Sequence, residues 1–373
     1  MGMTMEQYVN AYYGGELGIS KRYGISKADD LTYTSDPSAA FNTVYGAKVY
    51  NQLNTKSEVF KLLKKEPWTQ SGWRVMTARH ATTAGVAENN SEAGGALPDT
   101  DKPDILQVNA TLKQVVSTWE ISTKAAMLSE ADDGLGNLAA FMRKECSEAH
   151  MYAIDEMLLA SAETDEGNNM ESLDRVTASH AYAAAALSGA ADADIYDIDR
   201  SAQSWSDATV SHNSGTDRAL TLAMLDTVIQ GALENGVNYN NLILLTGYDT
   251  YQDLKALMLS TTNNTFRADL AATAAGSVNG VAGEAGLAFD SRVGAYDGIP
   301  IFLSQHVAKD TTSRIHLLDM EQLAVRVAAP TTYVDSTNVA VTQKMSHEFA
   351  LITAGELICY KFNTSGSIRD LNA

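Results

Sequence analysis

The sequence predicts an α+β fold, because helical and strand-like segments occupy separate parts of the chain. Three observations lead to this prediction. Two strand-like stretches lie within residues 61–125, a long helical stripe begins near residue 129, and strand candidates fill residues 291–373. At roughly 150 residues per domain, a chain of 373 residues has room for more than one lobe.

Residues 1–60 are predicted to form an arm with short helices. Residues 1–36 are rich in Gly, Tyr and Ser and show little periodicity, so they need another surface to lie on. Asp36-Pro37 is typical of a helix start, and a second short helix is expected over residues 57–65, ended by Pro67.

Residues 68–118 are predicted to form a projecting hairpin. An apolar stretch around Trp73 and a second one over residues 104–121 are strand-like, whereas residues 85–103 between them are polar and rich in Gly, Asn and Pro. Two strands with so long a tip have too little core to stand alone. We therefore expect them to reach towards a partner.

A long helix is the clearest prediction. Ser129-Glu130-Ala131-Asp132 has the form of a capping box, with Asp in its last position. Some 30 residues of helix, to about residue 163, make a rod of roughly 45 Å. The side chains expected to face the core recur at three- and four-residue spacing: Leu135, Leu138, Met142, Cys146, Ala149, Ala153 and Met157.

Further along, polar segments alternate with short apolar ones. Residues 165–215, rich in Ala, Asp and Ser, are interpreted as an inserted surface segment, and residues 262–290 as a loop. Helices are expected over residues 217–235, ended by Gly236, and from Asp249 or Thr250 to residue 259. Asp297-Gly298 predicts a tight turn. Strands are expected at residues 241–246, 299–303, 315–318, 323–327, 339–341 and 349–362.

The charge is strongly negative, at −19, which argues against a DNA-binding domain because phosphate contacts need Lys and Arg. Residues 1–80 carry ten basic and seven acidic residues (+3), and the remainder carries 17 and 39 (−22), which sums to −19. Either a basic arm lies on acidic neighbours, or the unevenness is chance. Two distant cysteines favour reduced thiols, and no signal peptide or membrane span is expected.

No catalytic, cofactor or metal site is predicted. Cys146 and His150 have a helical spacing suited to metal ligands, but no second pair accompanies them, so core packing and an ordinary polar role are favoured. The His347-Glu348 pair has no nucleophile motif beside it. An acidic cluster at Asp192, Asp194, Asp197 and Asp199 lacks the offsets of a calcium loop and is interpreted as solvated.

Several stretches in order carry a resemblance to one family. Glu92-Ala93-Gly94-Gly95 stands where family members have an acidic, glycine-containing tip, and Met127-Leu128-Ser129-Glu130 where they enter a long helix. Residues 241–257 and Gly298-Ile299-Pro300-Ile301 are similar to later strand and helix steps. From about residue 37 to 370, the chain resembles the major capsid proteins of tailed viruses, with the Hong Kong 97 fold.

The resemblance implies an arm (1–60), an E-loop hairpin with flanking strands (61–125), and a peripheral lobe with a spine helix and sheet (126–164 and 291–373). It also implies an axial lobe (165–290), in which the segment near 165–215 is longer than usual. Such proteins assemble as hexamers and pentamers into an icosahedral head, in the host cytoplasm, around double-stranded DNA that they bind without sequence specificity. The expected partners are portal, scaffolding and cement proteins, and neither a membrane nor enzymatic activity is expected.

The hairpin and arm of this fold drape over neighbouring subunits, so the resemblance places the inter-subunit contacts there. The alternatives are an encapsulin-type nanocompartment and an unrelated α+β enzyme. The residues expected at inter-subunit contacts are Lys21, Arg22, Trp73, Arg74, Arg79, Glu92, Gly94, Gly95, Lys102 and Lys113.

Overall fold

The computed structural model describes residues 59–78, 102–125, 127, 138–163, 169–260, 292–335 and 346–372. Contacts divide the chain into two units, Met1–Gln52 with Thr123–Phe141 and Leu53–Ser122 with Met142–Ala373. The described part of the first unit consists of a helical turn at residues 123–125, residue 127 and the first residues of one long helix. The second unit holds both large sheets. The expected arm and the loop at 262–290 lie outside the described residues.

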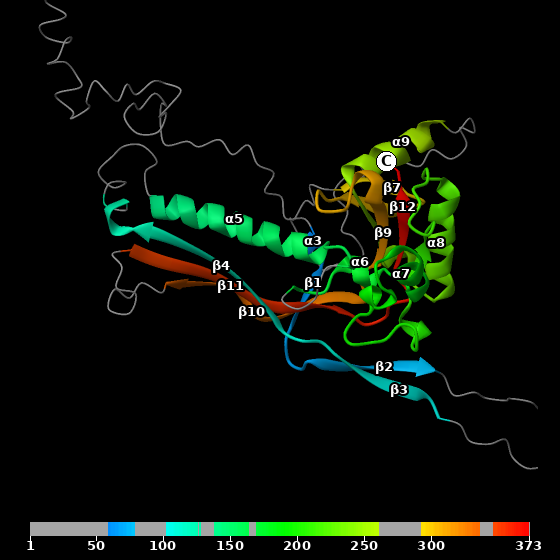
Figure 1. Ribbon diagram of the computed structural model, residues 1–373, viewed down its shortest axis with the longest axis horizontal. Coiled ribbons are helices and arrows are strands. Elements are labelled where there is room, and N and C mark those ends of the chain that lie inside the picture. Colours follow the sequence, from blue (N-terminus) through cyan, green and yellow to red (C-terminus); the bar gives the residue numbers. More distant parts are fainter. Residues whose placement is uncertain are drawn as a thin grey trace, which may run out of the picture. The chain divides into compact units, whose positions relative to one another are not determined.

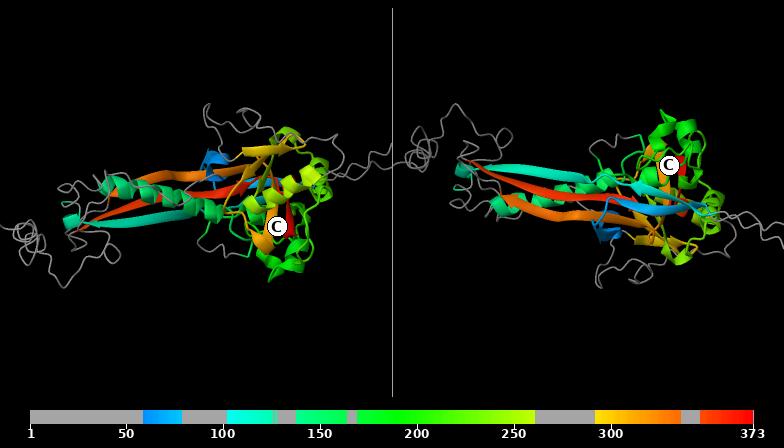
Figure 2. Two further views of the ribbon diagram at one scale, coloured as in Figure 1. Left: turned by 90° about the horizontal axis from the view of Figure 1, so that it is seen from above. Right: turned by 90° about the horizontal axis from the view of Figure 1, so that it is seen from below.

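A four-stranded sheet has the order β1-β10-β11-β4. Its strands are β1 (Lys64–Pro67), β10 (Leu323–Asp335), β11 (Ser346–Cys359) and β4 (Lys113–Ser122). Only β1 and β10 run parallel. The helix α5 (Leu138–Leu158) lies along one face of this sheet in both views of Figure 2. Alternation along β4 buries Val115, Trp119 and Ile121 on a single face.

The helix predicted from residue 129 to about 163 is present as α5, which ends at Leu158; its predicted start and capping box, residues 129–137, lie outside the described residues. The predicted core-facing stripe is wrong at Ala149, which is exposed. The buried face instead contains His150 and Asp155 beside Ile154 and Leu158. Periodicity of apolar residues missed this face because two of its members are polar. Both are tolerated in the core because both are hydrogen-bonded.

His150 ties α5 to the sheet below it. One ring nitrogen lies 2.7 Å from Ser117 Oγ on β4, and the other lies 2.8 Å from Thr353 Oγ1 on β11. Asp155 instead receives the start of α3 (Val59–Leu62), because its carboxylate accepts from Val59 N at 3.3 Å and Phe60 N at 2.7 Å. Helix α3 ends at Leu62, before the end expected at residue 65, since β1 begins at Lys64.

A six-stranded sheet has the order β5-β12-β9-β6-β8-β7. Its strands are β5 (Thr209–Ser211), β12 (Gly366–Leu371), β9 (Ser313–Asp319), β6 (Leu242–Thr246), β8 (Ile299–Leu303) and β7 (Arg292–Tyr296). The helices α8 (Leu222–Glu234) and α9 (Tyr248–Ser260) flank it (Figure 1). Asp297 and Gly298 have φ values of 48° and 81°, which confirms the predicted tight turn between β7 and β8.

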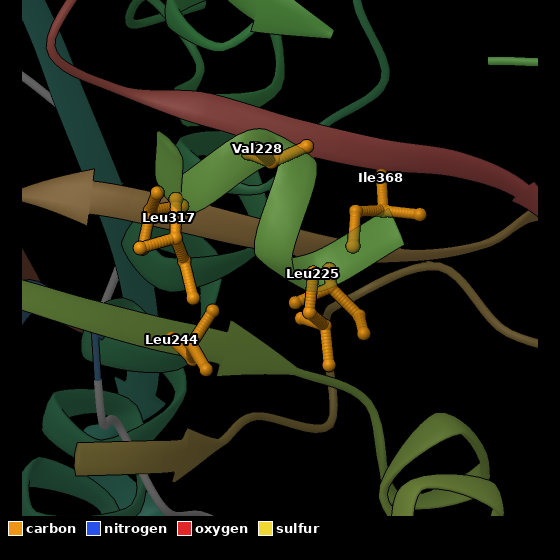
Figure 3. A pocket seen from close by; sticks show the side chains of 7 residues that line it. Leu225, Val228, Leu244, Leu317 and Ile368 are labelled. Carbon is orange, nitrogen blue, oxygen red and sulfur yellow. The ribbon is translucent and has the colours of Figure 1, made fainter. Parts of the chain in front are cut away.

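One core cluster lies between α8 and this sheet. Figure 3 shows Leu225 and Val228 of α8 facing Leu244, Leu317 and Ile368 of three strands. The gap between these side chains leaves no room for a water-sized molecule, so it is packing space. Gly236, with a φ of 79°, follows the end of α8 as predicted.

Residues 169–200, here named the linking segment, differ from the expected surface insertion. This segment contains α6 (Leu173–Val176), α7 (His180–Ala186) and the short helix η3 (Ala190–Ala193). Its polar composition conceals a buried ion-pair network in which Asp174 pairs with Arg314 and with Arg369 at 3.0 Å. The ring of His316 lies 4.0 Å from the same carboxylate and is neutral, because burial lowers its pKa to about 3. In a sequence, charged residues of this kind predict an exposed segment, but here they are buried beside partners of opposite charge.

The carboxyl-terminal part also differs from the expected peripheral lobe over 291–373. Strands β10 and β11 belong to the four-stranded sheet, whereas β7, β8, β9 and β12 belong to the six-stranded one. Strand β12 was not predicted, and the strand expected at 339–341 lies outside the described residues. The chain thus crosses between the two sheets near its end, so the expected boundary between lobes does not follow the sheets.

Candidate inter-subunit surface

The base of the predicted hairpin is a separate two-stranded sheet (Figure 1). Strand β2 (Gly72–Ala78) pairs antiparallel with β3 (Asp104–Asn109), which confirms the two predicted strands. The second predicted stretch, 104–121, is divided into β3 and β4, and β4 joins the four-stranded sheet instead. The tip at 79–101 lies outside the described residues.

One face of the β2–β3 pair packs onto the body of the chain. Trp73 is paired across the strands with Val108, which is 2% exposed. The Trp73 ring meets Tyr196 edge-to-face at 5.1 Å between centroids, and the Arg326 guanidinium lies 5.6 Å from the Trp73 ring centroid. These contacts anchor the hairpin to its own subunit.

The opposite face of the β2–β3 pair is apolar at its centre and exposed. Met76 lies directly across from Ile105, and these side chains are 58% and 63% exposed. Arg74 and Gln107 form the neighbouring exposed pair on the same face. A cross-strand pair of large apolar side chains in solvent is typical of a surface that another molecule covers.

A second exposed face lies on the four-stranded sheet, on the side away from α5 (Figure 2). Val116 on β4 pairs with Ile352 on β11, which in turn pairs with Thr332 on β10. Val116 is 49% exposed, and Val334, farther along β10, is 37% exposed. This face is less apolar than the Met76–Ile105 pair, so it is the weaker candidate.

The structure describes four of the residues expected at inter-subunit contacts, and it does not bring them together. Arg74 and Lys102 are exposed at the hairpin, where a neighbour could reach them. Trp73 is half-buried against its own chain, and Lys113 is half-buried at the start of β4. Their contacts with other subunits stay predictions. The others, Lys21, Arg22, Arg79, Glu92, Gly94 and Gly95, lie outside the described residues.

The side chains singled out in the sequence as candidate metal or acid–base groups make structural contacts instead. Both ring nitrogens of His150 are engaged by hydroxyl groups, so neither points to an open site. His347 stacks on Phe349 with centroids 6.2 Å apart, while Glu348 points to the other face of β11. Among the described residues, no group of three or more His, Cys, Asp or Glu side chains could hold a metal ion.

The acidic cluster at 192–199 stabilises its own turns. Asp192 accepts from Gly189 N at 2.7 Å, Asp194 from Arg200 N at 3.0 Å, and Asp199 from Ser201 N at 2.8 Å. Backbone capping therefore accounts for these carboxylates. Among the helices that the structure describes, none combines the length and apolar character that a bilayer crossing requires.

Sequence reasoning missed the buried titratable groups. Glu171 and Glu356 are 6% and 1% exposed, and the Glu171 backbone N–H donates to the Glu356 carboxyl across 185 residues of sequence. The Asp174 carboxylate meets Arg369 across a similar separation. No local sequence pattern predicts such pairs, because each partner has the sequence context of an ordinary surface residue. These partners come together only where the linking segment packs against β11 and β12.

Comparisons with known proteins agree with one another. The family model described as SU10 major capsid protein matches residues 48–355. The capsid of cyanophage A-1(L) has a similar structure, with a TM-score of 0.65 at 15% identity over 90% of this chain and 98% of that one. The capsid of a native GTA particle gives 0.55 at 14% identity over 93% and 98%.

An encapsulin is also similar in structure. The SrpI encapsulin of Synechococcus elongatus PCC 7942 has a TM-score of 0.50 at 12% identity, over 84% of this chain and 87% of that one. At such identities the likeness concerns the fold. No curated protein sequence matches this chain.

Proposed function

This chain belongs to the SU10 major capsid protein family, and we propose that the exposed Met76–Ile105 face of its hairpin joins neighbouring copies in the shell. The protein is a structural subunit of the head shell of a tailed virus, with the Hong Kong 97-type fold expected from the sequence. Copies of it associate with one another to form that shell.

The single observation that supports the proposed contact is the two-sided character of β2–β3. Trp73 fixes the inner face to its own subunit, so the outer face is held in place while Met76 and Ile105 remain in water. Covering such side chains contributes roughly 1–2 kcal/mol each. That is modest for one contact, but repetition around a closed shell multiplies it.

The finer arrangement extends this proposal. We infer hexamers and pentamers that enclose double-stranded DNA, assembled in the host cytoplasm with portal, scaffolding and cement proteins as partners. The charge of −19 supports a container whose inner surface does not hold DNA tightly. The free thiols of Cys146 and Cys359 suit assembly in a reducing compartment.

Substitution of the apolar pair tests the contact. The double variant Met76→Lys/Ile105→Lys places two ammonium groups on a face that a neighbour covers, so we expect folded subunits that fail to form shells. Electron microscopy and sedimentation measure assembly, and circular dichroism reports the fold. The matched control, Met76→Leu/Ile105→Val, keeps the face apolar and should assemble. Shells of the lysine variant at wild-type yield would contradict the proposal.

An encapsulin-type nanocompartment remains the second candidate, favoured by the structural likeness to the SrpI encapsulin. The two functions differ in what the shell encloses. Purified native particles that contain double-stranded DNA support the viral head, whereas a protein cargo in DNA-free particles supports the compartment. Nuclease protection and mass spectrometry of the contents distinguish them.

A further inference from the structure

The hairpin is joined to the four-stranded sheet by a short connection. Residues 68–71 lead from the end of β1 to the start of β2 (Figure 1). Trp68 N still donates to the Val327 carbonyl on β10 over 3.0 Å, so the connection leaves the sheet after Trp68. At its far end the Ser71 carbonyl accepts from Ala110 N over 2.9 Å and belongs to the hairpin. The chain therefore changes direction between these two bonds.

The side chain of Arg326 on β10 reaches this change of direction. Its Nη1 donates to the Gln70 carbonyl over 2.9 Å, and its Nη2 donates to Tyr360 Oη over 3.3 Å. Glu356 lies directly opposite Arg326 in the register of β10 and β11, yet both of these bonds go to other groups. The guanidinium thus binds the connection just before the hairpin starts.

The same guanidinium group lies against two aromatic rings. Its central carbon is 5.6 Å from the Trp73 ring centroid and 5.6 Å from that of Tyr360. These two rings meet edge to face, with centroids 6.1 Å apart. Trp73 belongs to the hairpin and Tyr360 follows β11, so Arg326 occupies the corner where the two parts meet. Apolar contact has no preferred direction, whereas the planar fork of a guanidinium has one.

Neighbouring strands hold the Arg326 side chain in this position. Tyr360 Oη donates to Glu66 Oε2 on β1, so the hydroxyl that accepts from Arg326 is itself fixed. The backbone of β10 also approaches β11 closely at this point. A Cβ added to Gly355 would lie 2.7 Å from the Arg326 carbonyl oxygen, nearer than packing allows. Groups on β1, β10 and β11 therefore position the fork independently of the hairpin.

We propose that Arg326 is a positioning residue that fixes the direction in which the β2–β3 hairpin leaves the subunit. Trp73 provides the packing that attaches the hairpin, and Arg326 provides the directional bonds that hold its angle. The consequence for assembly rests on the proposed inter-subunit contact, because a hairpin that points elsewhere does not bring Met76 and Ile105 to a neighbouring copy.

A distance measurement on the full, unassembled chain tests the direction. Spin labels on p-acetylphenylalanine, introduced at the exposed positions Ala78 of β2 and Ala256 of α9, leave the native cysteines untouched. Arg326→Met keeps an apolar stem without donors or charge. We expect electron paramagnetic resonance to show a distance distribution that is about twofold wider in this variant. The control Arg143→Met removes an arginine of α5 that stacks on Tyr333 at 4.1 Å, and it should keep the wild-type width.

Tyr360→Phe provides a second and milder test. It keeps the ring against Trp73 and removes the hydroxyl that accepts from Arg326, so we expect a smaller broadening with an unchanged circular dichroism spectrum. A role in stability alone would lower the Tm and leave the width unchanged. Wild-type width in the folded variants would overturn the positioning role of Arg326.

Shell yield separates this inference from the proposed contact. Broad distances together with a loss of shells in Arg326→Met support both. Broad distances with shells at wild-type yield support the role of Arg326 and contradict the contact through Met76 and Ile105. The variant Met76→Lys/Ile105→Lys, by contrast, should lose shells while its distance distribution keeps the wild-type width.

Discussion

At the scale of single residues, buried polar side chains connect the helices and strands of this subunit. His150 connects α5 to two strands, Asp155 connects α5 to the start of α3, and Asp174 connects α6 to the six-stranded sheet. Each replaces water with a specific partner, so each holds two elements in one geometry. Removing such a group leaves its partners buried and unsatisfied, which costs more than the bond itself contributed.

Asp155 offers the sharpest test at this scale. In Asp155→Ala, the backbone N–H groups of Val59 and Phe60 lose their acceptor inside the core. We expect a loss of about 2–4 kcal/mol in the free energy of unfolding. Asp155→Asn retains one acceptor oxygen and should lose roughly half as much. Urea unfolding of the unassembled chain measures both, and equal losses would show that the charge alone matters.

At the scale of elements, β2–β3 is anchored by the buried Val108 and by one aromatic side chain, Trp73. Trp73 contributes two edge-to-face contacts, with Tyr196 at 5.1 Å and Tyr360 at 6.1 Å. Its indole nitrogen is buried without a hydrogen-bond partner among the described residues. The ring is therefore held by packing, and its N–H contributes little.

This difference gives a prediction for the hairpin. Trp73→Ala should release β2–β3 from the body of the subunit, at a cost of about 2–4 kcal/mol, and expose it to proteases. Trp73→Phe keeps an aromatic ring and should stay close to wild type in stability and in shell yield. Limited proteolysis and hydrogen exchange over residues 72–78 and 104–109 report the release. Equal protection in both variants would contradict the anchoring role.

The elements that the sequence predicted well are those specified locally. Strand β6, helix α8 with Gly236 and the turn at Asp297-Gly298 each have an apolar pattern or turn chemistry within a few residues. Strand β12 is Gly366–Leu371 and contains Ser, Arg and Asp, so its pattern resembles a polar tail. It becomes a buried strand because Ile368 and Leu371 join the core of the six-stranded sheet and Arg369 reaches Asp174, 195 residues away.

For the same physical reason, only part of the candidate inter-subunit surface could be predicted from the sequence. An alternating strand such as β2 shows in its sequence that one face is buried, so a projecting hairpin could be predicted. The sequence could not show which face of the hairpin packs against its own subunit, because Trp73 contacts Tyr196 and Tyr360 from distant segments. The contact between Glu171 and Glu356 could not be predicted either, because 185 residues of sequence separate them.

At the scale of the whole molecule, buried groups of opposite type act at the two ends of the pH range. Burial lowers the pKa of His150 and His306 below 6.5, and that of His316 to about 3. The unfolded chain then binds more protons than the folded one below pH 6.5, so the histidine contribution is lost as pH falls. Burial, with the charge of Glu356, raises the pKa of Glu171 to about 8, and burial raises that of Glu356 to about 7. The folded chain then binds more protons than the unfolded one, so the contribution of these carboxyls is lost as pH rises from 4.5 to about 8.

Together these opposing contributions predict a stability maximum between pH 4.5 and 6.5, the unperturbed pKa values of Glu and His. Above pH 6.5 the histidine contribution levels off, and the buried Glu171 and Glu356 carboxyls set a downward slope up to about pH 8. Differential scanning calorimetry from pH 4 to pH 9 measures the curve. Glu356→Gln removes one of the two buried carboxyls, so it should reduce the alkaline slope and leave the acid limb in place; a slope remains because burial still raises the pKa of Glu171. A wild-type Tm that rises steadily to pH 9 would show that the buried carboxyls are ionised in the folded subunit.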